Sequence, residues 1–163
     1  MQSGWSEIRP IRASDLKAIC GIEQAAMPAP WNENQLHAEC AAENGYGWVV
    51  EEGGEIAGYA FFRFCLPECE LLHLVVAPAK RRRGLAGALL QQAQAHLVAA
   101  GCTCCLLEVR DSNVAARQLY AKMGFSQVGR RKNYYRQPIE DALLMHRNMI
   151  EGKRGGYENT EGC

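Results

Sequence analysis

The sequence predicts a single α/β domain with a mixed central β-sheet of six to seven strands, flanked by about four helices. The chain has 163 residues, of which 48% are hydrophobic, so it is long and apolar enough to bury a core. In the middle of the chain, apolar strand patterns alternate with helical patterns, which favours parallel pairing there. Toward both ends, pairs of strand patterns are separated by short turns. These favour antiparallel hairpins, so the sheet is expected to be mixed.

The domain is expected to span residues 1–150. From Glu151 the sequence reads EGKRGGYENTEGC, which is rich in glycine and charged residues and has no apolar face. Such a segment has too little apolar surface to bury, so residues 151–163 are expected to form a flexible tail.

The first half of the chain predicts a strand, two helices and a hairpin. Apolar residues recur at helical spacing after Ser14, a residue type that caps helices. Asn32 followed by Gln35 resembles a capping box, and Gly53 and Gly54 separate two strand patterns as a hairpin turn does. The expected elements are a strand over 5–12, helices over 15–26 and 32–42, and strands over 46–52 and 55–64.

The second half predicts strands that alternate with helices and then a last hairpin. Gly101 is expected as a helix C-cap, Ser112 or Asn113 as an N-cap, and Gly124 as the end of a short helix. The expected elements are a mostly apolar central strand over 68–78, a helix over 84–100, a strand over 102–110, a helix over 112–124, and strands over 125–135 and 140–149.

The charge balance argues against a protein that binds nucleic acid over its whole surface. Lys and Arg together number 18, as do Asp and Glu, so the formal net charge is zero. The N-terminal residues are polar, and no stretch approaches the roughly 20 apolar residues of a membrane helix. We therefore expect a cytoplasmic protein with no direct nucleic-acid or membrane partner.

Most of the eight cysteines fall inside apolar patterns, where a thiol packs like a small hydrophobic side chain. Disulfides are not expected in a chain with no secretory signal. A metal site that joins Cys65, Cys69 and the cluster over 102–105 is the alternative, but the expectation is that no metal is bound. The cysteines are Cys20, Cys40, Cys65, Cys69, Cys102, Cys104, Cys105 and Cys163.

Four consecutive cations, Lys80 to Arg83, precede a glycine and a helical pattern. The positive end of a helix macrodipole and its free N–H groups make this an unfavourable place for cations unless an anion binds there. Gly84 lets the backbone approach a ligand, and Ala86 and Gly87 keep bulky side chains away. The pattern predicts a phosphate site that suits a pyrophosphate. The alternative is a solvated basic turn before an ordinary helix, and neither a Walker nor a Rossmann motif is present.

The stretch Arg81-x-x-Gly84-x-Ala86 resembles the R/Q-x-x-G-x-G/A signature of the GCN5-related N-acetyltransferases, which hold coenzyme A by its pyrophosphate. Two positions depart from the family pattern. Ala77 stands where an Asp is usual, and Lys80 stands where an aromatic or polar residue is common. Neither position carries chemistry in the family.

Three later blocks resemble the RimI-type branch, whose members acetylate the N-terminal alanine of a small-subunit ribosomal protein. The stretches are LEVRDSNVAARQLYAKMGF over 107–125, RRKNYY over 130–135 and EDALLM over 140–145. The resemblance spans about residues 6 to 150. It implies the GNAT fold, acetyl-CoA as the cofactor with coenzyme A as product, and the N-terminus of a ribosomal protein as the acceptor.

The predicted cofactor site combines the basic turn with the central strand. Main-chain groups of the strand end are expected beside the pantetheine arm, with Val76 nearest the thioester carbonyl, where a backbone N–H stabilises developing charge. The resemblance adds Asn113, although helix capping alone would also explain an Asn there. The predicted cofactor-binding residues are Leu74, Val75, Val76, Arg81, Arg82, Arg83, Gly84, Leu85, Ala86, Gly87 and Asn113.

The resemblance implies Glu108 as the general base and Tyr120 as the general acid of the transfer. A base is needed because the acceptor amine loses a proton, and an acid because a thiolate leaves. For Glu108 the alternative is a carboxylate at a strand end that faces solvent. For Tyr120 it is a residue in the apolar stripe of a helix.

Two loops are expected to frame the acceptor. They carry Pro30 and Trp31 on one side and Tyr134 and Tyr135 on the other, with packing of Tyr135 on the sheet as an equal alternative. Other readings of the function remain open at this point. They are acetylation of lysine side chains or of a small amine, and a non-catalytic module that binds acyl-CoA.

Overall fold

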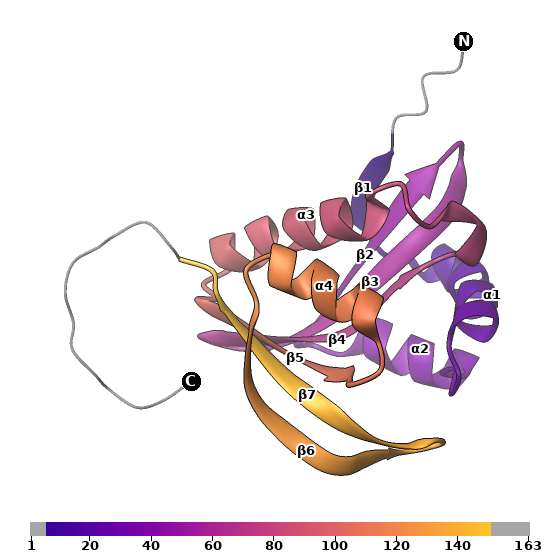
Figure 1. Cartoon of the computed structure of the whole chain (residues 1–163). Coiled ribbons are helices and arrows are strands. Elements are labelled where there is room, and N and C mark those ends of the chain that lie inside the picture. Colours follow the sequence, from indigo (N-terminus) through magenta and orange to yellow (C-terminus); the bar gives the residue numbers. More distant parts are fainter. Residues whose placement is uncertain (1–5, 151–163) are drawn as a thin grey trace.

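The structure is a computed structural model that describes residues 6–150, so the predicted tail over 151–163 lies outside the described residues. Within that range the strands form one sheet in the order β1-β2-β3-β4-β5-β7-β6 (Figure 1). The β4–β5 pair is parallel and the other pairs are antiparallel, so the predicted mixed sheet is confirmed. The strands are β1 (Glu7–Pro10), β2 (Gly45–Glu52), β3 (Glu55–Cys65), β4 (Glu68–Val76), β5 (Cys104–Arg110), β6 (Ser126–Arg136) and β7 (Ile139–Asn148).

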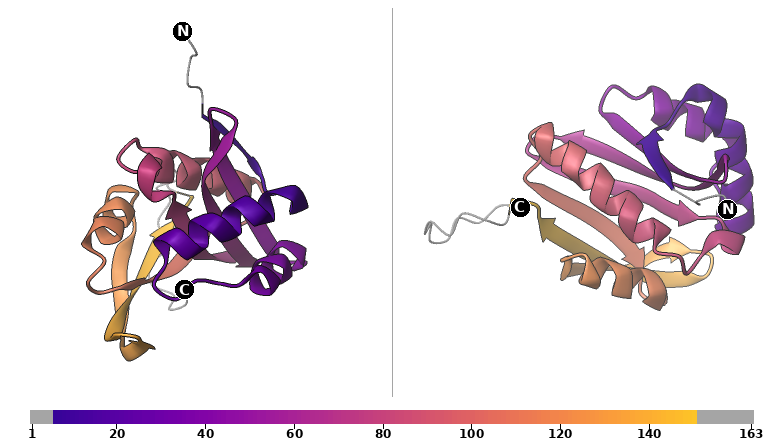
Figure 2. Two further views of the ribbon diagram at one scale, coloured as in Figure 1. Left: turned by 90° about the vertical axis from the view of Figure 1, so that its right-hand side faces the viewer. Right: turned by 90° about the horizontal axis from the view of Figure 1, so that it is seen from above.

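Two pairs of helices cover the two faces of the sheet, as the views in Figures 1 and 2 show. Helices α1 (Leu16–Ala26) and α2 (Glu33–Ala41) cover one face, and α3 (Leu85–Ala99) and α4 (Val114–Lys122) cover the other. The buried side chains accordingly fall into two clusters. The α1–α2 side is built around Tyr59, Phe61 and Val75, and the larger α3–α4 side includes Leu89 and Leu107. The described residues thus hold the predicted strand number and four α-helices.

The start of α1 differs from the prediction. A short 3-10 turn (Ala13–Asp15) precedes the helix, so Ser14 lies inside the turn and is not the capping residue. The carboxylate of Asp15 fixes this turn because it accepts the Arg12 N–H at 2.7 Å and an Arg9 N–H at 2.8 Å. These contacts lower the pKa of Asp15, with the Arg9 hydrogen bond as the largest cause.

Two other predicted caps are confirmed. The Asn32 side chain accepts the Gln35 N–H, and Gln35 accepts the Asn32 N–H, both at 2.9 Å, as in a capping box. Gly101 follows α3 with φ of +105°, the conformation that favours glycine after a helix, and Cys102 N–H donates to Leu97 O at 3.0 Å. Both helix ends are therefore set by the residues that the sequence singled out.

The strands β4 and β5 are paired over only part of their length. Their parallel pairing runs from Glu68 opposite Cys104 to Leu71 opposite Leu107 and then ends. A register shift between Phe61 and Phe62 of β3 falls where Leu72 of β4 has no partner in that strand, so β4 is bulged at the same level. The outer half of β4 is therefore paired with β3 on one edge only, and this opening is called the β4–β5 gap below.

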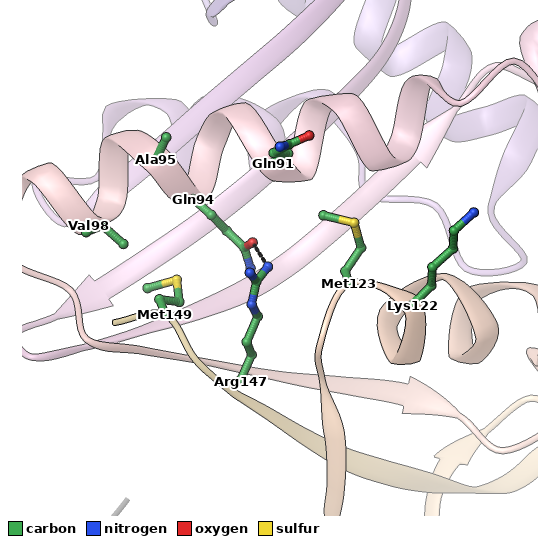
Figure 3. Close-up of a pocket in the computed structure, with 8 residues that line it drawn as sticks. All are labelled: Gln91, Gln94, Ala95, Val98, Lys122, Met123, Arg147 and Met149. Atoms are coloured by element: carbon green, nitrogen blue, oxygen red, sulfur yellow. Dashed lines mark hydrogen bonds between the residues drawn. The ribbon is translucent and has the colours of Figure 1, made fainter. Parts of the chain in front are cut away.

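A surface hollow of about 570 Å³ lies at the far end of α3, away from the gap (Figure 3). Arg147 of β7 donates there to the Gln94 side-chain oxygen, which ties β7 to the helix. None of the predicted site residues lines this hollow. Its lining is Gln91, Gln94, Ala95, Val98, Lys122, Met123, Arg147 and Met149.

Candidate active site

The β4–β5 gap exposes main-chain groups of the outer half of β4. Ala77 N–H donates to Ala57 O of the β3 side at 2.8 Å. Because the direction of these groups alternates along a strand, the N–H groups of Leu74 and Val76 point the other way, into the gap. Val75 faces β3, where it is paired with Tyr59. The structure thus leaves Leu74 and Val76 available to a ligand in the gap, whereas the main chain of Val75 is used in the sheet.

The phosphate turn follows directly from this open strand. Gly84 is the N-cap of α3 with φ of +75°, and the first intrahelical bond runs from Ala88 N–H to Gly84 O. The N–H groups of Leu85, Ala86 and Gly87 precede that bond and face out of the helix end. A Cβ at Gly84 would meet no atom within 4 Å, so the approach to these N–H groups is open.

The cations of the turn are partly held by the protein itself. Glu52 of β2 pairs with Lys80 Nζ at 3.1 Å and with Arg83 at 2.8 Å, and these contacts lower its pKa, with Lys80 as the largest cause. Arg81 donates to Val76 O at 3.2 Å, which ties the turn to the end of β4. Arg82 is exposed, with a positive φ of 63°, so its guanidinium is accessible to a ligand at the helix end.

Glu108 lies where β5 passes the last residue paired with β4. Its neighbours Leu107 and Val109 are buried on the α3–α4 side, so the Glu108 side chain points to the α1–α2 face. Arg131 Nε of β6 lies 3.0 Å from the carboxylate. A hydrogen bond to the same carboxylate is the largest cause that raises the pKa of Tyr134.

A second carboxylate stands next to this group. Glu70 of β4 is paired with Leu106 of β5, two residues before Glu108, and so shares its face of the sheet. Partial burial and then the charge of Glu108 raise the pKa of Glu70. Two carboxylates therefore share this face of the sheet, where they can attract a cationic acceptor amine in competition with Arg131.

Tyr120 projects from α4 into the α3–α4 side of the core. Its ring packs edge-on against Phe125 at 5.7 Å between centroids, and the side chain is buried. Burial, followed by the electrostatic effects of Cys105 and Tyr135, raises the pKa of its hydroxyl above the ordinary value. The hydroxyl therefore stays protonated at physiological pH, which is the state that a general acid needs.

The remaining predicted residues take different positions. Asn113 caps α4, accepting the Ala116 N–H at 3.2 Å, so the structural alternative raised for this residue is present. Tyr134 is 49% exposed and meets the Tyr135 ring edge-on. The guanidinium of Arg110 lies 4.0 Å from the ring centre of Tyr135, which places this ring against β5.

Trp31 follows the partly buried Pro30 in the loop between α1 and α2 and lies over the α1–α2 face of β4. Its ring stacks on His73 of β4 with 3.7 Å between centroids. Its backbone N–H donates to Glu23 of α1 at 2.9 Å. The loop is thus tied to the sheet beside the half of β4 that borders the gap.

Sequence reasoning missed several members of this site. Glu23, His73 and Arg131 were not singled out, although one of them carried a visible signal. Glu23 lies seven residues after Leu16 and four after Ile19, so the helical period puts a carboxylate on the apolar face of α1. Arg131 stands in the block over 130–135, but nothing in that block indicates its contact with Glu108, because the contact depends on how β6 pairs with β7.

The acetyltransferase (GNAT) family model matches residues 16–125. The chain belongs to the GNAT acetyltransferase family. Acyl transfer is the activity of this family, and GNAT acetyltransferases use acetyl-CoA. The predicted fold, enzyme class and cofactor are confirmed at this level.

Several relatives of this chain carry names that specify ribosomal protein bS18 as the acceptor. The ribosomal protein bS18-alanine N-acetyltransferase of Escherichia coli (strain K12) is 35% identical over 140 residues, which cover 85% of this chain and 94% of the relative. A putative enzyme of the same name from Bacillus subtilis (strain 168) is 31% identical over 140 residues, which cover 85% and 92%.

Solved structures agree with this relationship. The crystal structure of the ribosomal-protein-S18-alanine N-acetyltransferase from Escherichia coli has a TM-score of 0.85 at 31% identity and covers 94% of this chain and 100% of that one. Arabidopsis thaliana NAA60 in complex with acetyl-CoA has a TM-score of 0.81 at 21% identity, with coverage of 91% and 100%, and shows the same fold.

Over residues 6–150, two features of the structure fit the parts of acetyl-CoA. The open edge of β4 offers N–H groups to an amide-rich arm, and the helix end offers N–H groups to a pyrophosphate. Over the same residues, no helix is long and apolar enough to cross a membrane. No group of three or more His, Cys, Asp or Glu side chains in this part of the chain is arranged to hold a metal ion.

Proposed function

We propose that this GNAT enzyme transfers the acetyl group of acetyl-CoA to the α-amine of an N-terminal alanine of a small-subunit ribosomal protein of the bS18 type. The observation that carries the proposal is the β4–β5 gap, with open main-chain groups of β4 on one side and Glu108 on the other. The acceptor class rests on the relatives, which are named for alanine N-acetylation of bS18.

In this proposal, bound acetyl-CoA supplies a thioester, and the chain supplies position and proton transfer. The helix end at Gly84 and the cations of the turn bind the pyrophosphate, and the N–H groups of Leu74 and Val76 align the arm. The Val76 N–H also stabilises the negative charge that develops on the thioester oxygen.

Two side chains then move protons across the gap. Glu108 accepts a proton from the acceptor ammonium, directly or through water, so that the neutral nitrogen can attack the carbonyl. Tyr120 donates a proton to the departing thiolate sulfur, since burial keeps its hydroxyl neutral. The nitrogen becomes cationic on attack, and the second proton that it then loses returns to the Tyr120 phenolate directly or through water. Glu108 faces the α1–α2 side of the sheet and Tyr120 of α4 lies on the α3–α4 side, so in this proposal they act on the thioester from opposite sides.

The acceptor is framed on the α1–α2 face. Trp31 with Pro30 forms one wall and Tyr134 with Tyr135 the other, and Glu70 and Glu108 attract the ammonium between them. A chain end enters such a slot more readily than a lysine on a continuous chain. An α-amine, with an ordinary pKa of about 7.7–8.0 against about 10.4 for lysine, also presents more neutral nucleophile at pH 7.

The test is acetylation of two matched peptides, read by mass spectrometry. One peptide has a free N-terminal alanine and no lysine, and the other has the same sequence with a blocked N-terminus and one internal lysine. The proposal predicts α-amine acetylation of the first and little reaction of the second. Equal rates on both would instead identify an enzyme of broad acceptor range, and reaction of the second alone a lysine acetyltransferase.

A further inference from the structure

A buried carboxylate joins several elements beside the acceptor slot. Glu23 of α1 is fully buried, with 0% of its side chain exposed. It accepts the backbone N–H of Trp31 at 2.9 Å and the hydroxyl of Tyr59 of β3, and its Oε2 lies 3.4 Å from His73 Nδ1 of β4. A buried polar group is costly unless it is hydrogen-bonded, and here the two oxygens of Glu23 are shared among three partners.

The partners of Glu23 are not equivalent. Tyr59 is itself fully buried, and it belongs to the core cluster of the α1–α2 side. His73 keeps 12% of its side chain exposed and lies at the level where β4 leaves β5. Trp31 belongs to the acceptor-side loop and stacks on the His73 ring at 3.7 Å with 30° between the planes. Two of the three partners therefore border the slot.

We infer that Glu23 and His73 are positioning residues that fix the Trp31 wall of the acceptor slot. Glu23 holds the Trp31 backbone through its N–H, and His73, oriented by the same carboxylate, holds the indole ring from below. Together they restrain both the main chain and the side chain of Trp31, so that the slot is formed before the acceptor arrives. This inference rests on the proposed function, because it assigns Trp31 to the acceptor side of the reaction.

A role that is merely structural makes a different prediction. If Glu23 only supports the core, any loss of its partners should lower thermal stability and affect both substrates alike. If it positions Trp31, its loss should raise the peptide KM and leave the acetyl-CoA KM and the kcat at saturating peptide unchanged, because Glu108 and the phosphate turn lie on other elements.

The experiment compares four variants of the full chain with the wild type. Glu23→Ala removes the carboxylate, and Glu23→Gln keeps an oxygen for the Trp31 N–H. His73→Ala removes the ring under Trp31 and leaves the Glu23 carboxylate and its bond to the Trp31 N–H in place. Tyr59→Phe is the matched control, since it removes a hydrogen bond to the same carboxylate without touching the loop.

We expect the peptide KM to rise about tenfold in Glu23→Ala and in His73→Ala, and to return to within about threefold of wild type in Glu23→Gln. Tyr59→Phe should lower the melting temperature and leave both KM values unchanged. Equal rises in Tyr59→Phe, or unchanged peptide KM in His73→Ala, would overturn the inference.

A second readout needs no substrate. Trp31 fluorescence is obtained as the difference between each protein and the same protein with Trp31→Phe, and its quenching by acrylamide reports how firmly the ring is held. We expect greater quenching in His73→Ala and Glu23→Ala than in the wild type and in Tyr59→Phe. Equal quenching in all proteins would overturn the inference. If wild-type protein left the alanine peptide unmodified, the proposed function would fall, and this comparison would still decide whether Glu23 and His73 hold Trp31.

Discussion

Arg131 Nε lies 3.0 Å from the carboxylate of Glu108, so the proposed general base is ion-paired in the structure. The guanidinium comes from β6, is 55% exposed and lies 5.7 Å from the centre of the Tyr134 ring. A cation in this place occupies the position that the acceptor ammonium needs. The contact therefore links the β6–β7 hairpin, which carries Tyr134 and Tyr135, to Glu108.

Replacement of Arg131 by Ala should lower the peptide KM, because the acceptor ammonium no longer competes for Glu108. The gain should stay within about fivefold, since an exposed ion pair contributes about 0–1 kcal/mol. For the same reason the melting temperature should hardly change. Steady-state kinetics at low and high salt check this, and a peptide KM that rises in the variant would show that Arg131 helps to bind the acceptor.

Replacement of Gly84 by Val should weaken acetyl-CoA binding strongly. The side chain would cover the N–H groups at the start of α3, and φ of +75° is strained for a β-branched residue. Gly54→Val is a matched control, because Gly54 has φ of +81° and equally open surroundings but lies in the β2–β3 turn. Both variants should lose similar stability, and isothermal calorimetry should find weaker binding in the first alone. Equal binding in both would remove the phosphate-site assignment.

Replacement of Tyr120 by Phe should reduce turnover by about 10²–10⁴-fold, the usual contribution of a general acid, with little change in stability. The ring still packs on Phe125, so the fold should persist. Since burial raises the Tyr120 pKa, its hydroxyl deprotonates only above its ordinary range near 10. The wild-type pH–rate profile should accordingly show no loss of activity from Tyr120 between pH 7 and about 9.5. Full turnover in the variant would leave Tyr120 as a packing residue.

The buried cysteines should resist alkylation at neutral pH. A hydrogen bond with Cys105, followed by burial, raises the pKa of Cys69, and burial raises the pKa of Cys102 to about 11. A raised pKa lowers the thiolate fraction, and the thiolate is the nucleophile. Exposed Cys65 should react with iodoacetamide in the native protein, and Cys69 and Cys102 only after unfolding. Metal analysis should find no stoichiometric zinc, and one zinc per chain would contradict the assignment of these thiols to the core.

The elements whose signals are local were predicted well. Hydrophobic period, capping residues such as Asn32 and the glycine after α3 each depend on a few neighbouring positions, and the structure agrees with them. Ser14 was misassigned because Asp15, one residue on, forms stronger contacts with Arg9 and Arg12. Both residue types favour helix starts, and the sequence alone does not say which finds a partner.

For the candidate site, the sequence gives a signal only where a motif is present. The turn before α3 and the carboxylate of Glu108 belong to short, specific patterns. The end of β4–β5 pairing, the contact of Arg131 with Glu108 and the stacking of Trp31 on His73 join residues far apart in the chain. These contacts follow from the register of the sheet and from the path of the α1–α2 loop, which no local pattern specifies.

The most direct test of the account is the acetyl-transfer rate of Glu108→Gln, measured by rapid quench with an alanine peptide and acetyl-CoA both saturating. The neighbouring carboxylate supplies the control, as Glu70→Gln keeps the same charge change on the same face of the sheet. We expect Glu108→Gln to be slower by about 10²–10⁴-fold with unchanged acetyl-CoA affinity, and Glu70→Gln to stay within about threefold of wild type. A Glu108→Gln variant that keeps the wild-type rate near neutral pH would contradict the assignment of the β4–β5 gap and Glu108 as the catalytic centre.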